Sequence, residues 1–196
     1  FQPSALEFME VKGIELVNLH FPHLKMHIPE GAQAALLIEI DGFDLALVEA
    51  QTLALSEFLF EAQTLDILLA DNENDKEKLW KLRRAIPEVV KKTSIYKEED
   101  TVVPRARLPE LLDVVKRIGN QHNFQSVCYG HAGDGNLHVN ILKDKLSDDE
   151  WNMSIPVAIR ELFVQVKKLG GTLTGEHGIG WVQKPYVDVF FSPIQF

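Results

Sequence analysis

Two histidines separated by six residues are the part of this chain best suited to chemistry. They are His131 and His138, in the segment YGHAGDGNLHVN, residues 129–140. The pair Asp134-Gly135 predicts a two-residue turn between two strands, because both central positions of a type I′ turn need positive φ. A turn there places His131 directly opposite His138, with Cβ atoms roughly 4.5–5.5 Å apart. Two imidazoles at that separation can reach one metal ion, so the segment predicts a metal site.

The alternation of side chains along a strand assigns a face to every residue of this predicted hairpin. Asn140 shares the face of His138, whereas Leu137 and Val139 point to the opposite face, where a core would lie. The same pairing puts Tyr129 opposite Asn140. We therefore expect one polar face for binding and one apolar face for packing. Buried histidines that satisfy each other or a backbone carbonyl remain the alternative at this point.

A glycine-rich segment supplies a third candidate ligand. Residues 170–180, GGTLTGEHGIG, contain five glycines that allow unusual dihedrals and close approach of the backbone to a ligand. Glu176 would complete a His₂Glu set with His131 and His138, an open arrangement for a catalytic divalent ion. Such donors favour zinc, manganese or iron over magnesium or calcium. His177 is adjacent and suits a general base near neutral pH. The alternative is a glycine-rich turn with a helix cap.

One arginine can be placed by helical geometry. In the helix expected over residues 74–92, Arg83 lies at the edge of the apolar stripe, while Arg84 points almost directly away at ~100° per residue. An inward arginine at a pocket rim can hold a carboxylate through charge-assisted hydrogen bonds. A snorkelling side chain or an ion pair within the domain is the alternative for Arg83.

Two further patterns are weak. His20, His23 and His27 have metal-like spacing, but they lie among prolines with no expected helix to fix them. Residues 71–75 resemble the start of a calcium loop, yet the glycine and the closing glutamate that such a loop requires are missing. We interpret residues 71–75 as an acidic helix start.

The elements that position these residues indicate an α+β fold. Hydrophobic periodicity, capping boxes and turn signals predict strands at 34–40 and 65–70, a hairpin at 126–142, and helices at 44–62, 74–92, 109–122 and from 147 to about 170. Residues 1–30 are expected to be an irregular lead-in with at most one short helix. This order predicts helices packed on one side of an antiparallel sheet.

Composition bounds the class of protein. With 196 residues, 45% hydrophobic and 25% charged, the chain fits a single globular domain over residues 1–196. A formal charge of −9 argues against a nucleic acid or an anionic membrane surface as the partner. No apolar run approaches the ~20 residues of a transmembrane helix. The lone Cys128 suits a reducing compartment, so we expect a cytoplasmic protein. The first residue is not Met and residues 190–196 are largely apolar, so both ends are expected to be cut.

Several motifs together resemble one family. Residues 130–138, GHAGDGNLH, and 175–180, GEHGIG, with DTVVP at 100–104 and the helix bearing Arg83, closely resemble the C-terminal domain of FAD-linked 2-hydroxyacid oxidoreductases. This family includes enzymes that act on glycolate, D-lactate and D-2-hydroxyglutarate. The resemblance covers nearly the whole chain from Gln2 onward.

The resemblance implies a ferredoxin-like cap domain that covers FAD held by a separate N-terminal domain. On this view the chain is a fragment that lacks that N-terminal domain and the extreme C-terminal segment. The implied site residues are His131, His138 and Glu176 for the metal, with zinc preferred and manganese or iron as alternatives, Arg83, Asn140 and Lys97 for the substrate, and His177 as the base. The implied reaction is oxidation of a D-2-hydroxy acid to the 2-oxo acid by hydride transfer to flavin, and we expect this chain alone to be inactive.

Other readings of the chain stay open. It could be a stand-alone metal- and carboxylate-binding module without redox activity, or a member of the ether-lipid synthase branch of the same superfamily. Glu176 speaks against the latter, because it completes the metal site of the hydroxyacid enzymes. A bare apolar face that causes self-association would favour the cap domain over the module. Peripheral membrane association through an electron acceptor is an alternative to a purely cytoplasmic location. Some members have a hydroxyl residue where this chain has Pro87, so substrate preference is not carried over.

Overall fold

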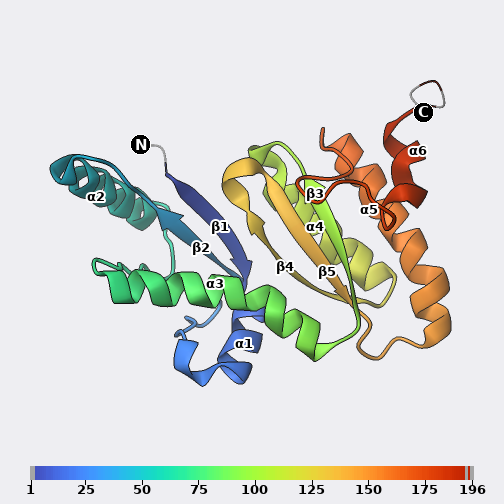
Figure 1. Ribbon diagram of the computed structural model, residues 1–196, viewed down its shortest axis with the longest axis horizontal. Coiled ribbons are helices and arrows are strands. Elements are labelled where there is room, and N and C mark those ends of the chain that lie inside the picture. Colours follow the sequence, from blue (N-terminus) through green and yellow to red (C-terminus); the bar gives the residue numbers. More distant parts are fainter. Residues whose placement is uncertain (1–2, 193, 195–196) are drawn as a thin grey trace.

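A computed structural model describes residues 3–192 and 194, and its centre is a five-stranded antiparallel sheet (Figure 1). The strand order is β2-β1-β4-β5-β3. The strands are β1 (Ala5–Glu10), β2 (Ala34–Glu39), β3 (Tyr96–Val102), β4 (Gln125–His131) and β5 (Asn136–Leu142). The α+β class with an antiparallel sheet is confirmed. At the ends that we expect to be cut, residues 1–2, 193 and 195–196 lie outside the described residues.

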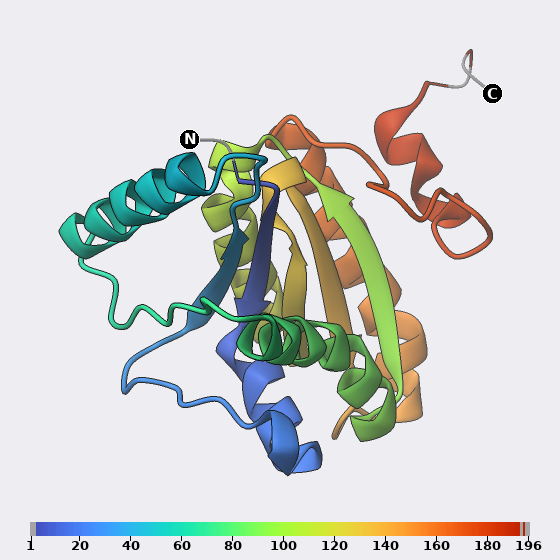
Figure 2. The same cartoon turned by 60° about the vertical axis from the view of Figure 1, so that its left-hand side comes forward.

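Helices cover both faces of the sheet, which corrects the expectation of one covered face. Helices α1 (Val11–His20) and α3 (Glu73–Thr93) lie on one face, and α4 (Leu108–Gln121) and α5 (Ile155–Lys168) lie on the other (Figure 2). The reason is that the central strands are apolar on both sides. Val127 of β4 packs with α1 and α3, whereas its neighbour Cys128 packs with α4 and α5. Two separate apolar clusters therefore form, one on each side.

The N-terminal segment is regular rather than an irregular lead-in. Strand β1 occupies the middle of the sheet, between β2 and β4, and α1 follows it directly. Strand β3 was also missed, because its sequence YKEEDTV lacks the apolar alternation of a typical strand. The strand expected at 65–70 does not form. Within the described residues this segment pairs with no strand, and a strand needs a neighbouring edge for its hydrogen bonds. The strand at 34–39 is confirmed, but it lies at the sheet edge rather than buried.

The remaining expected elements are confirmed, with shifted ends. Helix α3 begins at Glu73 because Asn72, and not Asn74, is the N-cap: its side chain accepts a hydrogen bond of 3.0 Å from the Asp75 N–H. The capping box at Ser147 forms with Glu150 and precedes a π-helical turn at Glu150–Ser154. Short η1 (Pro22–Leu24), η2 (Arg105–Arg107), η5 (Lys184–Tyr186) and α6 (Val187–Phe190) complete the fold.

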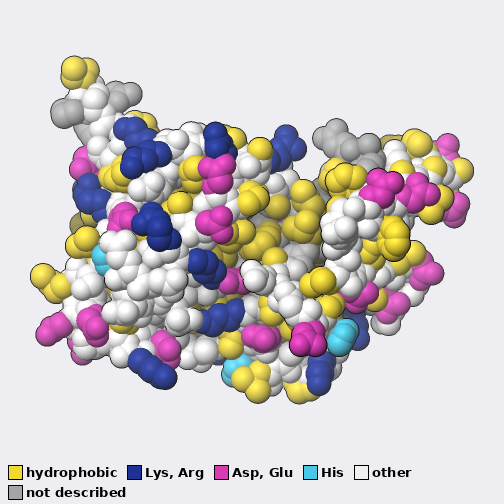
Figure 3. All heavy atoms as spheres, turned by 180° about the vertical axis from the view of Figure 1, so that it is seen from behind, with side chains coloured by type: hydrophobic (Ala, Val, Ile, Leu, Met, Phe, Trp, Pro, Cys, Tyr) yellow, Lys and Arg dark blue, Asp and Glu magenta, His cyan; other side chains and the backbone are white. Residues whose placement is uncertain are grey.

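Helix α2 (Leu45–Glu61) stands apart from the sheet. None of its seventeen residues is buried, although leucine, phenylalanine and alanine dominate it. We call this helix the α2 arm. Figure 3 shows it from behind, with apolar and acidic side chains together. The sequence contains no Lys or Arg between Lys25 and Lys76. The arm is therefore an exposed surface that is both apolar and acidic. Within the described residues, no helix combines the length and apolar character that a membrane crossing requires.

Candidate metal and substrate site

The hairpin that carries both histidines forms, but its register differs from the predicted one. His138 pairs with Tyr129 rather than with His131, and Asn140 pairs with Val127. The prediction of a two-residue turn was wrong. Of the pair Asp134-Gly135, only Gly135 adopts a positive φ, 76°, and residues 132–134 form a 3₁₀ turn. The register is shifted by two residues. Because strand side chains alternate with a period of two, this shift leaves every side chain on its predicted face.

His131 and His138 are therefore diagonal neighbours on one face, and the glycine-rich loop brings Glu176 to them. The Glu176 Oε1 atom lies 3.1 Å from His138 Nε2 and 3.6 Å from His131 Nε2. The three potential ligand atoms all lie within 4.8 Å of one another. Two imidazole nitrogens and a carboxylate oxygen at these separations fit one divalent ion with open positions.

Glu7 of β1 orients His131. The Nδ1 atom of His131 lies 2.8 Å from Glu7 Oε1, so an Nδ1–H that donates to Glu7 leaves Nε2 free to face Glu176. A carboxylate behind a histidine commonly fixes the tautomer of a metal ligand in this way. Glu7 is itself buried and paired with Arg83, whose Nη2 and Nε lie 2.8 and 3.0 Å from Oε2. The geometry of His131 thus agrees with a ligand role.

Arg83 points inward, as the helical geometry predicted, and is only 6% exposed. Its guanidinium makes the ion pair within the domain that the sequence left open, and it lies 5.0 Å from the centre of the Tyr129 ring. A substrate carboxylate would have to share this guanidinium with Glu7. Substrate binding by Arg83 stays a prediction.

His138 is the most enclosed member of the cluster. Its ring lies between Glu176 at Nε2 and Glu98 at Nδ1, where the distance to Glu98 Oε1 is 3.6 Å. Burial lowers the pKa of His138 and outweighs the nearby carboxylates that raise it. The neutral imidazole is therefore favoured, and this is the form that binds metals. The Tyr129 hydroxyl donates to Glu98 at 3.3 Å and holds that carboxylate beside His138.

His177 stands next to this cluster and is about half exposed. Its ring stacks on His138 with centroids 5.1 Å apart, and its Nε2 lies 3.7 Å from Glu176 Oε1. A solvent-accessible imidazole beside candidate metal ligands suits a general base, although that role stays a prediction.

Asn140 and Lys97, two predicted substrate residues, make contacts that do not point to a substrate site. Asn140 shares the face of His138, but it is 1% exposed and its amide donates to the Val127 carbonyl at 3.3 Å. Lys97 lies over the Trp151 ring at 5.0 Å, on the side of β3 opposite Glu98. The structure does not bring Lys97 to the histidines. Substrate contacts by these two residues stay predictions without support from the geometry.

Sequence reasoning missed three carboxylates of this site. Glu98 and Asp100 lie two positions apart on β3, so both face the histidines, and Glu7 comes from β1. The period-two spacing of Glu98 and Asp100 was a usable signal, had the charged segment been recognised as a strand. Glu7 gave no signal, because it lies 124 residues from His131.

Asp100 is the anchor of the glycine-rich loop. It accepts hydrogen bonds from the backbone N–H groups of residues 175–177, from the Thr174 hydroxyl and from Asn136. Burial alone would raise the pKa of Asp100, but these donors, led by the His177 N–H, outweigh it and hold the pKa well below its usual range. The carboxylate therefore stays charged beside the site.

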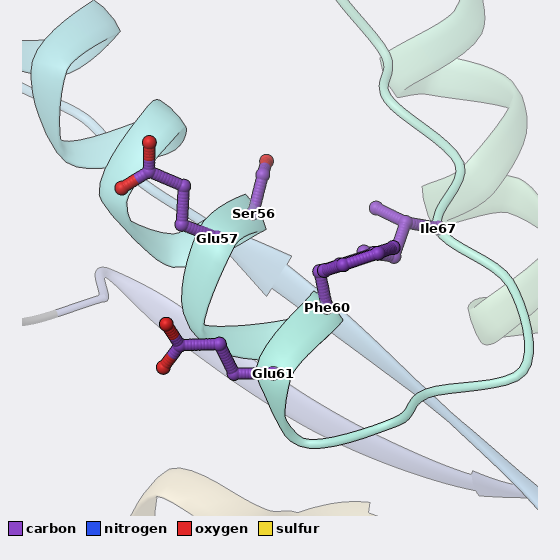
Figure 4. A pocket seen from close by; sticks show the side chains of 5 residues that line it. All are labelled: Ser56, Glu57, Phe60, Glu61 and Ile67. Atoms are coloured by element: carbon purple, nitrogen blue, oxygen red, sulfur yellow. The ribbon is translucent and has the colours of Figure 1, made fainter.

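A cavity lies elsewhere in the fold. It has a volume of about 500 Å³, and α2 and the segment after it line it through Ser56, Glu57, Phe60, Glu61 and Ile67 (Figure 4). Phe60 and Ile67 face each other across it, with carboxylates only at its margin. None of its lining residues belongs to the histidine cluster, so we do not assign the chemistry to it.

Comparison with known proteins identifies the family of this chain. The family described as FAD linked oxidases, C-terminal domain, matches residues 1–196. The chain is 31% identical over 198 residues to a D-lactate dehydrogenase of Anaerostipes hadrus, covering 98% of this chain and 42% of that protein. It is 30% identical to the glycolate oxidase subunit GlcD of Bacillus subtilis (strain 168), covering 95% and 39%. It is 34% identical to a D-2-hydroxyglutarate dehydrogenase of Stutzerimonas stutzeri (strain A1501), covering 74% and 32%.

The chain therefore belongs to the family of C-terminal domains of FAD linked oxidases. Its similarity extends to proteins named for oxidation of 2-hydroxy acids. It spans about two fifths or less of the length of these relatives.

Proposed function

We propose that this chain is the substrate- and metal-binding domain of an FAD-dependent oxidoreductase that oxidises a D-2-hydroxy acid to the 2-oxo acid. The substrate classes are those of its relatives: glycolate, D-lactate or D-2-hydroxyglutarate. The observation that carries the proposal is the convergence of His131 Nε2, His138 Nε2 and Glu176 Oε1, with His177 stacked beside them. A 2-hydroxy acid offers its hydroxyl oxygen and a carboxylate oxygen to a metal bound by such a cluster.

The proposed metal ligands are His131, His138 and Glu176, with zinc preferred and manganese or iron as alternatives. An ion bound there supplies Lewis-acid chemistry that lowers the pKa of a substrate hydroxyl. Glu7 keeps the His131 Nε2 atom directed at the site. Burial keeps His138 neutral and thus ready to donate an electron pair.

The chain's own part in the reaction is to bind the acid and to move a proton. His177 would accept the hydroxyl proton on its ring nitrogen, and its exposure lets that proton pass on to solvent. The hydride that leaves Cα would be accepted by FAD, which we propose that a separate domain binds. We propose that Arg83 forms its ion pair with Glu7 and binds the substrate carboxylate through its remaining N–H groups.

The exposed α2 arm supports a cap domain over a stand-alone binding module. Leu53, Phe58 and Phe60 are each at least 60% exposed, and no element of the described chain covers them. Surfaces of this kind usually contact another protein surface. We propose that they contact the rest of a larger flavoprotein, and we expect the isolated chain to self-associate. Cytoplasmic location stays a prediction.

Metal analysis tests the proposal. We would purify the chain, offer it zinc, manganese and iron, and compare it with a His131→Ala, His138→Ala double variant. A His20→Ala, His23→Ala double variant is the matched control, because it removes two exposed histidines outside the cluster. Near-stoichiometric metal in the wild type and the control, lost in the cluster variant, is expected. Equal metal content in all three proteins would contradict the site.

Substrate binding and turnover separate the enzyme domain from a binding module. The metal-loaded chain is expected to bind D-lactate or D-2-hydroxyglutarate more tightly than the L enantiomers in an NMR titration. It is expected to give no sustained dye reduction with added FAD, because the family of C-terminal domains accounts for residues 1–196. Sustained reduction by the isolated chain would overturn that expectation, and metal binding without any hydroxy-acid binding would favour the module.

A further inference from the structure

The loop that carries Glu176 and His177 has little packing of its own. Residues 175–178 are exposed, and the nearest buried side chain before them is Leu173. Such a segment would sample many conformations if nothing fixed its backbone. Yet the Glu176 carboxylate must reach two histidines on β4 and β5 for the cluster to form. Some other group has to hold this loop.

One oxygen of Asp100 receives almost all of the loop's donors. The Oδ2 atom accepts from the N–H groups of Gly175, Glu176 and His177 at 2.9, 2.8 and 2.8 Å, and from the Thr174 hydroxyl at 2.7 Å. Successive N–H groups that converge on an anion in this way form a nest. Bonds to an ionised acceptor are roughly twice as strong as neutral ones.

Asp100 is fixed on its other side by the sheet. It pairs with His138 on the neighbouring strand, and its Oδ1 atom accepts from Asn136 Nδ2 at 2.6 Å. The same residue therefore touches the strand that carries one candidate ligand and the loop that carries another. Its position sets the distance between the His138 ring and the Glu176 carboxylate.

The glycine at position 175 permits this contact. A Cβ atom there would lie 2.1 Å from Asn136 Nδ2 and 2.9 Å from Asp100 Oδ1. Both groups belong to buried, hydrogen-bonded residues that have little room to move. Any side chain at position 175 would push the loop off the Asp100 carboxylate.

We infer that Asp100 is a positioning residue that holds the backbone of residues 175–177 and thereby places the Glu176 carboxylate and the His177 ring in the site. Its role in loop order stands on the hydrogen bonds alone. Its role in metal binding rests on the proposed function. Asp100 itself is no metal ligand in this arrangement, because both of its oxygens are occupied by N–H and O–H donors.

The test compares Asp100→Asn and Gly175→Ala with Asp113→Asn, which changes an exposed carboxylate on α4. Asp100→Asn removes the charge and turns an amide N–H₂ group toward donors. Gly175→Ala leaves Asp100 intact but displaces the loop. Amide hydrogen exchange of the metal-free chain reports the loop directly, and the Val139 amide on β5 reports the fold.

In both variants we expect exchange at residues 175–177 to become at least about tenfold faster, with Val139 unchanged. Affinity for Co²⁺, used as a spectroscopic probe, should fall by about 10–100-fold. Asp113→Asn should match the wild type in both measurements. If Asp100→Asn unfolds the chain, exchange at Val139 will also become faster. Gly175→Ala then decides, through faster exchange at residues 175–177 with exchange at Val139 unchanged.

Unchanged exchange at residues 175–177 in the folded variants would overturn the inference. A wild-type chain that binds no Co²⁺ would instead count against the proposed function, while the exchange result would still decide the role of Asp100 in ordering the loop. Faster exchange with unaltered Co²⁺ affinity would show that Asp100 orders the loop without setting the metal site, and would overturn that half of the inference.

Discussion

Glu99 offers the sharpest test of the physical argument, because it is a carboxylic acid that is buried in the fold. It is 1% exposed, and among the described residues neither of its carboxylate oxygens has a hydrogen-bond partner. It lies on the face of β3 opposite Glu98, near Gln183 and Tyr186. Burial raises the pKa of Glu99 from 4.5 to about 8, although the positive charge of Lys97 and the nearby Gln183 amide oppose part of this rise. The folded protein therefore holds Glu99 as a neutral acid at pH 7.

The pH dependence follows from this pKa. In the unfolded chain Glu99 ionises above pH 4.5, whereas the folded chain retains its proton up to about pH 8. The unfolded state thus binds fewer protons in this window, and the free energy of unfolding falls as the pH rises from 4.5 to about 8. Each tenfold change in proton affinity corresponds to about 1.4 kcal/mol, so the full loss is roughly 5 kcal/mol and an upper bound. Above pH 8 the loss levels off.

Glu99→Gln removes this dependence while keeping the shape of the side chain. We expect the variant to match the wild type within about 1 kcal/mol at pH 5 and to be more stable by roughly 2–5 kcal/mol at pH 8. Urea unfolding followed by tryptophan fluorescence at pH 5 to 9 measures both values. Glu15→Gln, at an exposed position on α1, should follow the wild-type profile. A stability difference between Glu99→Gln and wild type that is the same at pH 5 and pH 8 would refute the reasoning.

Two further substitutions test the hairpin turn and the start of α3. Gly135 and Gly31 both have positive φ, but a Cβ at Gly135 would lie 2.0 Å from the Val103 carbonyl oxygen, while a Cβ at Gly31 would meet nothing within 4 Å. In thermal unfolding, Gly135→Ala should cost about 3 kcal/mol or more and Gly31→Ala only about 1–2 kcal/mol, and equal costs would count against the steric argument. Asn72→Ala should cost about 1 kcal/mol through loss of the cap, and Asn74→Ala less than about 0.5 kcal/mol. The reverse order would restore Asn74 as the cap.

The sequence alone determined the parts of the site that depend on local pattern. The hairpin, the shared face of His131 and His138, and the nearness of Glu176 follow from strand alternation and glycine content, together with the family resemblance. These inferences survived a turn prediction that was wrong, because a register shift of two residues preserves the face of each side chain. The inward direction of Arg83 likewise depends only on helical periodicity.

The tertiary structure decided everything that depends on contacts between distant segments. Glu7 reaches His131 across 124 residues, and Asp100 reaches the glycine-rich loop across 74 to 77 residues. Local patterns carry no information about such partners. Strands β1 and β3 form because β4 and β5 offer them free edges, even though the charged sequence of β3 predicts no strand. The pairing of Arg83 with Glu7 has the same cause, since only the packing of α3 on β1 and β4 brings the two charges together.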